Sequence, residues 1–188
     1  MTLTHFAIIA VCAYLLGSLS FAIIVSKLTL GKDIRNYGSG NAGLTNAYRT
    51  MGAKKTLLVL LGDIAKGAAA VSIGMVLAGP VGKLTAGIFV ILGHMFPLYF
   101  GFKGGKGVLV AGGAILAIQP ILLPVLTVVF LLCLVPTGMV SLGSIAMAAS
   151  YPVLTLIYGL LKGFAADDLI VCVVGAAIMG GMVIWMHR

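Results

Sequence analysis

The stretch FAIIAVCAYLLGSLSFAIIV, Phe6 to Val25, decides the fold class. It carries no charged residue, and at about 1.5 Å per helical residue it matches the ~30 Å hydrocarbon core of a bilayer. The rest of the chain has the same character, since 61% of its 188 residues are hydrophobic and only 9% are charged. A soluble domain has about 25% charged residues. The sequence therefore predicts an all-α, polytopic membrane helix bundle.

Seven apolar segments are spaced along the chain. Gln119 and Pro120 separate the fourth from the fifth, and a single helix across both, from Val108 to Val135, would be about 42 Å long, more than a ~30 Å core needs. Proline also interrupts helices. We therefore expect seven transmembrane helices in a single integral membrane domain, residues 1–188. The segments are Leu3–Leu30, Thr56–Ala78, Leu84–Phe100, Val108–Ile118, Ile121–Pro136, Leu142–Leu161 and Leu169–Met186.

The basic residues predict how the helices are oriented. The loop Gly31–Lys55 holds five cations, the loop Gly101–Gly107 holds two, and Arg188 ends the chain. Seven crossings place all three groups on one face, whereas six would separate Arg188 from the loops. Because cytoplasmic loops of membrane proteins are enriched in Lys and Arg, this face is expected to be cytoplasmic. The N-terminus then lies outside and the C-terminus in the cytoplasm.

Several classes of site are disfavoured by what the sequence lacks. The three cysteines lie far apart in apolar runs, which argues against a disulfide framework or a zinc site. There is no Glu, no Ser/His/Asp set near one loop, and no cluster of metal ligands. Carboxylate base chemistry, a metal and a cofactor are therefore not expected. The positive-inside bias explains part of the net charge of +8, and no nucleic acid partner is expected.

The first polar stretch is NYGSGNAGLTNAYRT, Asn36 to Thr50. Glycine permits positive φ and close approach of the backbone to a ligand, small polar side chains supply neutral donors, and arginine supplies a planar, permanently charged fork. This set suits a phosphate or another small oxyanion. The simpler alternative is a connecting loop whose arginine only follows the positive-inside rule. The residues concerned are Gly38, Ser39, Gly40, Asn41, Gly43, Thr45, Asn46 and Arg49.

The second polar stretch is FGFKGGKGVLVAGG, residues 100–113. Its KGGKG run directly precedes the apolar segment that begins at Val108. Backbone amides of a glycine-rich turn at a helix N-terminus favour anions, and Lys103 and Lys106 add charge. The spacing of a Walker A loop is absent, because Val108 stands where Ser or Thr is required, so ATP is not implied. The alternative is a basic turn at the membrane surface.

Three further features carry weaker signals. Ser141 and Ser144 stand at the start of a helix, where N-capping is the simpler explanation for one hydroxyl. His94, in GHMFP, is an ionisable residue inside a span, which suggests either a function or a hydrogen bond within or between helices. Asp63 and Lys66 lie three residues apart in the second span, and we expect them to form a structural ion pair.

Taken together, these motifs resemble those of a known family. GSGNAGLTN with Arg49, GHMFP, FGFKGGKG, VSLGSI and the terminal His-Arg closely resemble, in order, the motifs of the bacterial acyl-phosphate-dependent glycerol-3-phosphate acyltransferases. The resemblance runs from Leu16 to Arg188. Two departures are Leu44, where the family usually has Ala, and Val110, where it usually has Thr. The chain also stops at Arg188, before the family's usual Asn-Ile-x-Arg-Leu continuation.

The resemblance implies an enzyme of the bacterial cell membrane with seven helices and no cofactor. It would transfer a fatty acyl group from acyl phosphate to the 1-hydroxyl of sn-glycerol 3-phosphate. The products would be lysophosphatidic acid and phosphate, in the first step of phospholipid synthesis. The active site would lie on the cytoplasmic side, in contact with membrane lipid, and the enzyme would be coupled functionally to one that produces acyl phosphate.

Carried over by motif, the resemblance implies catalytic roles for Ser39, Arg49, Lys106 and His187. The base is either His187 or a phosphate oxygen of the acyl donor, and the phosphate oxygen is favoured because the chain has few candidate bases. The alternatives from other classes are a transporter for a small phosphorylated solute and a non-catalytic assembly subunit. Substrate binding is implied for Gly38, Gly40, Asn41, Thr45, Asn46, Lys103, Gly104, Gly105, Gly107, Ser141 and Ser144.

Overall fold

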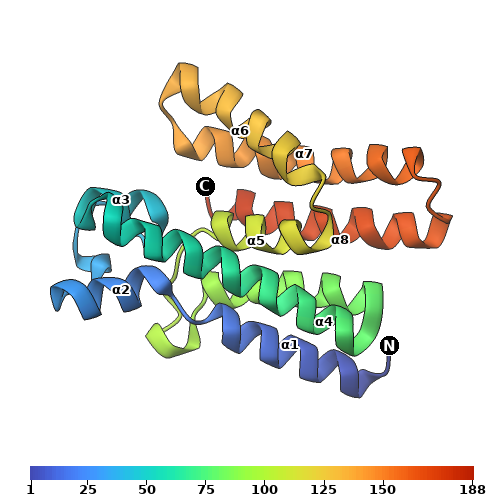
Figure 1. Ribbon diagram of the computed structural model, residues 1–188, viewed down its shortest axis with the longest axis horizontal. Helices are drawn as coiled ribbons and strands as arrows, with labels where there is room; N and C mark the ends of the chain where they lie inside the picture. The colour runs from blue at the N-terminus through green and yellow to red at the C-terminus, as the bar shows by residue number, and fades with distance from the viewer. The chain divides into compact units, whose positions relative to one another are not determined.

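The computed structural model describes all residues, 1–188, and contains only helices (Figure 1). This confirms the predicted all-α class. The chain forms two compact units, residues 1–114 and residues 115–188. The helices are α1 (Leu3–Gly17), α2 (Phe21–Leu30), η1 (Ile34–Asn36), α3 (Leu44–Met51), α4 (Ala53–Met95), η2 (Leu98–Phe100), α5 (Val108–Ile118), α6 (Leu122–Thr137), α7 (Val140–Leu161) and α8 (Ala166–Trp185).

The first apolar segment is interrupted rather than continuous. Helix α1 ends at Gly17 and α2 begins at Phe21. At this break the Ser18 hydroxyl donates to the Tyr14 carbonyl oxygen (2.8 Å) and accepts from the Leu98 amide (3.2 Å). The Tyr14 hydroxyl donates to the Phe96 carbonyl oxygen (2.6 Å). The break is therefore fixed by hydrogen bonds to the segment that follows α4.

Helix α4 is a hairpin of two helical arms, which correspond to the second and third predicted spans. It has 43 residues and folds back at Ala78 and Gly79, whose φ and ψ are not helical (Figure 1). The arms approach closely, since a Cβ on Gly74 would collide with the Gly82 carbonyl and a Cβ on Gly82 with that of Gly74. Small residues allow such approach in membrane bundles. Because α4 folds back, its two ends lie at the same end of the unit.

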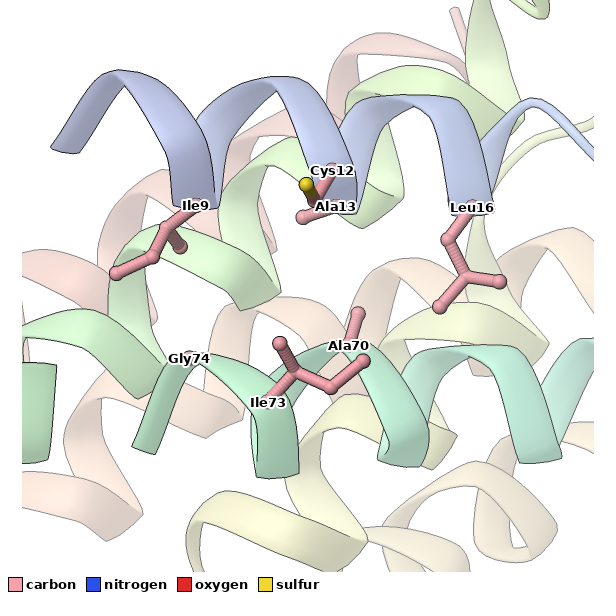
Figure 2. A pocket seen from close by; sticks show the side chains of 7 residues that line it. All are labelled: Ile9, Cys12, Ala13, Leu16, Ala70, Ile73 and Gly74. Atoms are coloured by element: carbon pink, nitrogen blue, oxygen red, sulfur yellow. The ribbon is translucent and has the colours of Figure 1, made fainter. Parts of the chain in front are cut away.

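Helices α1 and α5 pack against the arms of α4. A Cβ on Gly17 or Gly93 would overlap the backbone of the facing helix, and so would one on Gly67 or Gly113. Glycine therefore sets the interhelical distance on both sides of the hairpin. The contact is not perfectly filled, and Figure 2 shows a small pocket between α1 and α4. Its lining is Ile9, Cys12, Ala13, Leu16, Ala70, Ile73 and Gly74.

The second unit consists of α6, α7 and α8 with the end of α5. Helix α5 ends at Ile118 and α6 begins at Leu122, so the break predicted from Gln119 and Pro120 is confirmed. The Thr155 hydroxyl of α7 donates to the Gln119 side-chain oxygen (3.1 Å), and both residues are buried. This contact gives the polar residue of the break a hydrogen-bond partner in the unit's interior.

Four segments are long and apolar enough to cross a membrane: Leu3–Leu30, Ala53–Phe100, Val140–Leu161 and Ala166–Trp185. The second holds 48 residues because it contains both arms of α4. Helices α5 and α6, with 11 and 16 residues, are apolar but shorter. The chain therefore has several membrane-capable helices, and the count of seven crossings stays a prediction.

Candidate active site

The two glycine-rich stretches meet at the open end of the α4 hairpin. Residues 31–52 lead into α4 and residues 96–107 lead out of it. Arg35 joins them, because its Nη1 donates to the carbonyl oxygens of Phe100 (2.6 Å) and Lys103 (3.1 Å). A Cβ built on Gly105 would lie 2.6 Å from the Ala42 carbonyl oxygen. Segments more than 60 residues apart in sequence are thus in direct contact.

Arg35 is itself held by Asp33. Its Nε donates to Asp33 Oδ1 (3.0 Å) and its Nη2 to Oδ2 (2.8 Å). The hydrogen bonds from the Arg35 side chain lower the pKa of Asp33 from 3.8 to about 2, with smaller contributions from the Arg35 amide and from the charge of Lys27. Sequence reasoning missed Arg35. The available signal was that Asp33 is the only carboxylate among the five cations of this loop.

Asn46 gives the first stretch its shape. Its side-chain oxygen accepts from the Ser39 amide (3.0 Å), and its Nδ2 donates to the carbonyls of Tyr37 and Asn41 (3.0 Å each). The residue is only 2% exposed. Both ends of the predicted substrate-binding amide are therefore engaged by the loop itself. The structure shows Asn46 as the organiser of the loop, and a contact with substrate stays a prediction.

The other predicted residues of the first stretch lie around the hydrogen bonds of the Asn46 side chain. Gly38 (φ 59°) and Gly40 (φ 72°) adopt left-handed conformations, as the glycine pattern predicted. Ser39 between them is exposed. Thr45 and Arg49 are exposed on α3, and Asn41 is half-buried. The hydroxyl and guanidinium groups of this stretch are thus accessible around a loop that is held by internal hydrogen bonds.

The second stretch requires a correction to the reason for its glycines. The Gly104 amide donates to the Met95 carbonyl (3.1 Å) and the Gly105 amide to the His94 carbonyl (3.2 Å), at the end of α4. A Cβ on Gly104 would collide with the His94 carbonyl. The predicted close approach is therefore made to α4, and these two amides are not directed at a ligand. The positions of Gly104 and Gly105 beside a substrate stay predictions.

The two lysines flank this turn. Lys103 is exposed and Lys106 is half-buried. Gly107 (φ 82°) turns the chain into α5, which begins at Val108. The first amides of an α-helix lack intrahelical acceptors, so Lys106 stands beside a helix start that favours anions.

The predicted residues of the second unit lie on α7 and after α8. The capping explanation is wrong, because Met139 is the N-cap of α7 and no side chain caps it. The Ser144 hydroxyl donates to the Val140 carbonyl (2.8 Å), whereas Ser141 is exposed. The His187 Nδ1 lies 2.8 Å from the Val183 carbonyl oxygen. A carbonyl only accepts, so this contact places the proton of a neutral ring on Nδ1.

A family model described as glycerol-3-phosphate acyltransferase matches residues 7–188. The chain belongs to this family. It is 40% identical over 182 residues to the glycerol-3-phosphate acyltransferase of Bacillus subtilis, covering 97% of this chain and 90% of the relative. It is also 40% identical over 182 residues to that of Geobacillus kaustophilus, covering 97% and 88%.

Two solved structures extend the similarity to the fold. One is a crystal structure of PlsY (YgiH), an integral membrane glycerol 3-phosphate acyltransferase, in its glycerol 3-phosphate form. It has a TM-score of 0.83 and 34% identity, covering 97% of this chain and 88% of that one. The lysophosphatidic acid form gives a TM-score of 0.81 and 32% identity with the same coverage. This chain is therefore an integral membrane acyltransferase of phospholipid synthesis, rather than a transporter or an assembly subunit.

In this acyltransferase the small pocket between α1 and α4 does not suit the phosphate of glycerol 3-phosphate. The only atom in its lining side chains that is not carbon is the Cys12 sulfur (Figure 2). The cations and exposed hydroxyls instead gather on the segments at the open end of the α4 hairpin. That end is the candidate active site of the first unit.

Proposed function

We propose that this acyltransferase moves a fatty acyl group from acyl phosphate to the 1-hydroxyl of sn-glycerol 3-phosphate. The observation that supports the proposal best is the contact between two cation-bearing, glycine-rich loops through Arg35. Both substrates carry a phosphate, and cations with neutral donors suit phosphate recognition. The apolar helices offer the acyl chain a hydrocarbon environment.

Acyl phosphate is a mixed anhydride with a good leaving group, so the protein mainly has to align the hydroxyl and stabilise developing charge. In this scheme Arg49 and Lys106 neutralise phosphate oxygens, and the Ser39 hydroxyl donates to the carbonyl oxygen as it becomes an oxyanion. One such donor contributes about 3–4 kcal/mol to transition-state stabilisation. Since the amides of Gly104 and Gly105 are occupied, the free amides at the start of α5 are the backbone donors we assign to phosphate.

The proton of the attacking hydroxyl is assigned to the acyl donor itself. The hydroxyl oxygen bonds to the acyl carbon, the bond from that carbon to the phosphate oxygen breaks, and a phosphate oxygen takes the proton. His187 is the competing base through its Nε2, because its Nδ1 contacts the Val183 carbonyl. If His187 is the base, the His187→Ala variant loses the limb of the pH–rate profile that rises toward alkaline pH.

The topology that fits this reaction has seven crossings, with the active site on the cytoplasmic side of the bacterial cell membrane. It is supported by the concentration of Lys and Arg in residues 31–55 and 101–107, at one end of the α4 hairpin. Acyl phosphate would then come from a neighbouring cytoplasmic enzyme that makes it. In the second unit, Ser141 and His187 are the residues we assign to substrate, whereas the Ser144 hydroxyl is bonded to Val140 in its own helix and is given no contact with substrate.

The test is a donor comparison with purified protein in detergent. Palmitoyl phosphate and glycerol 3-phosphate should yield lysophosphatidic acid and inorganic phosphate in equal amounts. Acyl-CoA and acyl-carrier protein should yield no lysophosphatidic acid. Turnover with a thioester donor and none with palmitoyl phosphate would overturn the proposed donor while leaving the acyltransferase identity intact.

A further inference from the structure

Lys66 lies at the centre of a buried polar cluster inside the first unit. Its Nζ is 2.7 Å from the Leu19 carbonyl oxygen, 2.7 Å from Asp63 Oδ1 and 3.0 Å from His94 Nδ1. The Phe21 ring covers it, with the centroid 5.8 Å away. The side chains of Lys66 and Asp63 are each 2% exposed. The predicted ion pair is thus confirmed, and it has two further partners that the sequence did not indicate.

The chemistry of an ammonium group fixes the state of the histidine. An ammonium has three donors and no acceptor, and here three acceptors surround it. His94 Nδ1 must therefore accept, which places the proton of the neutral ring on Nε2. Asp63 Oδ1 also lies 3.7 Å from His94 Nδ1. The ring orientation of His94 is consequently determined by the Asp63–Lys66 pair.

The opposite edge of the His94 ring faces the second glycine-rich stretch. A Cβ built on Gly105 would overlap His94 Nε2 and would lie 2.6 Å from the Ala42 carbonyl oxygen. The backbone carbonyl of His94 accepts the Gly105 amide at 3.2 Å. Contacts therefore run without a gap from Lys66 through His94 to Gly105, the residue before Lys106, and on to the first stretch at Ala42.

The Leu19 contact extends the cluster to a third element. Leu19 lies in the break between α1 and α2, and its carbonyl receives the Lys66 ammonium. One side chain thus joins this break to both arms of α4, since Lys66 is on the first arm and His94 on the second. The cluster connects the elements that carry both glycine-rich stretches.

Stability alone is a weak reason for such a cluster. Buried ion pairs are often no more stabilising than apolar residues of similar volume, and ionisable groups inside a membrane protein usually serve a function. We propose that Asp63, Lys66 and His94 are positioning residues for acyl transfer. They hold Gly105, and with it Lys106, against the first stretch in the geometry that binds a substrate phosphate. This inference rests on the proposed role of Lys106.

The experiment removes the charges without leaving one unpaired. The double variant Asp63→Asn with Lys66→Met keeps side-chain volumes similar, and kcat and KM for glycerol 3-phosphate and for the acyl donor are measured beside Tm. We expect kcat/KM for at least one substrate to fall about tenfold or more, because misplacement of a phosphate-binding group by 1 Å costs up to about 100-fold. The matched control is Thr155→Val, which removes a buried hydrogen bond in the other unit and should retain wild-type kinetics.

A double-mutant cycle separates positioning from general damage. Gly105→Ala pushes a methyl group toward the His94 ring, so its effect on kcat/KM should be smaller in the Asp63→Asn/Lys66→Met background than in wild type. If the double variant does not fold, His94→Phe takes its place, since it retains the Asp63–Lys66 pair and removes both ring nitrogens of His94. Two results would overturn the inference. One is a wild-type kcat/KM in Asp63→Asn/Lys66→Met or, if that variant does not fold, in His94→Phe. The other is an effect of Gly105→Ala that is as large in the variant background as in wild type.

A failure of this positioning role can be told apart from a failure of the proposed function. If wild type is inactive with palmitoyl phosphate but active with another donor, the donor assignment is wrong. The same variants are then compared with wild type using the active donor, because glycerol 3-phosphate is common to both assays.

Discussion

Within residues 1–114, polar contacts join segments far apart in the sequence, whereas within residues 115–188 most of them stay inside one helix. In the first unit Arg35 reaches Phe100 and Lys66 reaches Leu19. In the second, Ser144 donates to Val140 in its own helix. Both units consist mainly of apolar helices, but ten of the twelve Lys and Arg residues lie in the first. This difference supports our proposal that the first unit binds the charged headgroups of the substrates.

The largest effect on kcat/KM is expected when a cation is removed from one of the two glycine-rich stretches. Arg49→Ala or Lys106→Ala should each reduce kcat/KM by about 100-fold, because one charge that stabilises the transition state is lost. Tm should stay near the wild-type value. Steady-state kinetics with purified protein measure this, with Lys162→Ala, an exposed lysine of the second unit, as the control. If both variants keep the wild-type kcat/KM, Arg49 and Lys106 do not belong to the active site.

A smaller effect is expected when the link between the two loops is cut. Arg35→Ala removes the hydrogen bonds to Phe100 and Lys103, so the loops lose their shared geometry and kcat/KM should fall about tenfold. Lys32→Ala, an exposed cation in the same loop, should change kcat/KM little. Equal losses in the two variants would mean that charge, and not the link, is what matters.

Asn46 provides a test in which stability changes more than chemistry. Asn46→Ala leaves the Ser39 amide and the carbonyls of Ile34, Tyr37 and Asn41 without this partner. We expect the free energy of unfolding to fall by about 1–3 kcal/mol, measured as a lower Tm. Asn36→Ala, at an exposed position of the same stretch, is the control. A normal Tm together with a raised KM would instead favour direct contact between Asn46 and substrate.

Removal of a serine hydroxyl in the second unit should change kcat/KM less. The Ser144 hydroxyl is bonded to its own helix, so Ser144→Ala should alter kcat/KM by less than about twofold, or about 0.4 kcal/mol. Ser141→Ala, on an exposed hydroxyl, should have the larger effect. A reversal of this order would place the Ser144 hydroxyl at the substrate.

The smallest expected effect is a change in Tm with pH. Hydrogen bonds from Arg35 lower the pKa of Asp33 from 3.8 to about 2. A lowered pKa in the folded state means that the pair stabilises the protein fully above about pH 4 and ceases to do so as the pH falls toward 2. The Tm difference between wild type and Asp33→Asn should therefore be constant from pH 5 to 8 and should shrink below pH 4. A difference that persists unchanged below pH 2 would contradict the pairing.

The features predictable from sequence were those that depend on neighbouring residues. The spacing of Asp63 and Lys66 predicted their ion pair, and Pro120 predicted the end of α5. Composition predicted the all-α membrane class, and motif order predicted the family. Each of these follows from helix periodicity, backbone restriction or local pattern.

The remaining features depend on how α4 folds back. Only that turn brings Lys66 to His94 and residues 31–52 to residues 96–107. The sequence therefore could not show that the Gly104 and Gly105 amides are taken by the end of α4. The capping prediction at Ser141 and Ser144 was wrong because α7 begins at Val140, before either serine.

The measurement that tests the central claim most directly is a double-mutant cycle between the two stretches, with Arg49→Ala, Lys106→Ala and the combined variant compared by kcat/KM. If both cations act on one transition state, the combined loss should be clearly smaller than the product of the single losses. Single losses that multiply, or a single variant with wild-type kcat/KM, would show that the two stretches do not form one site.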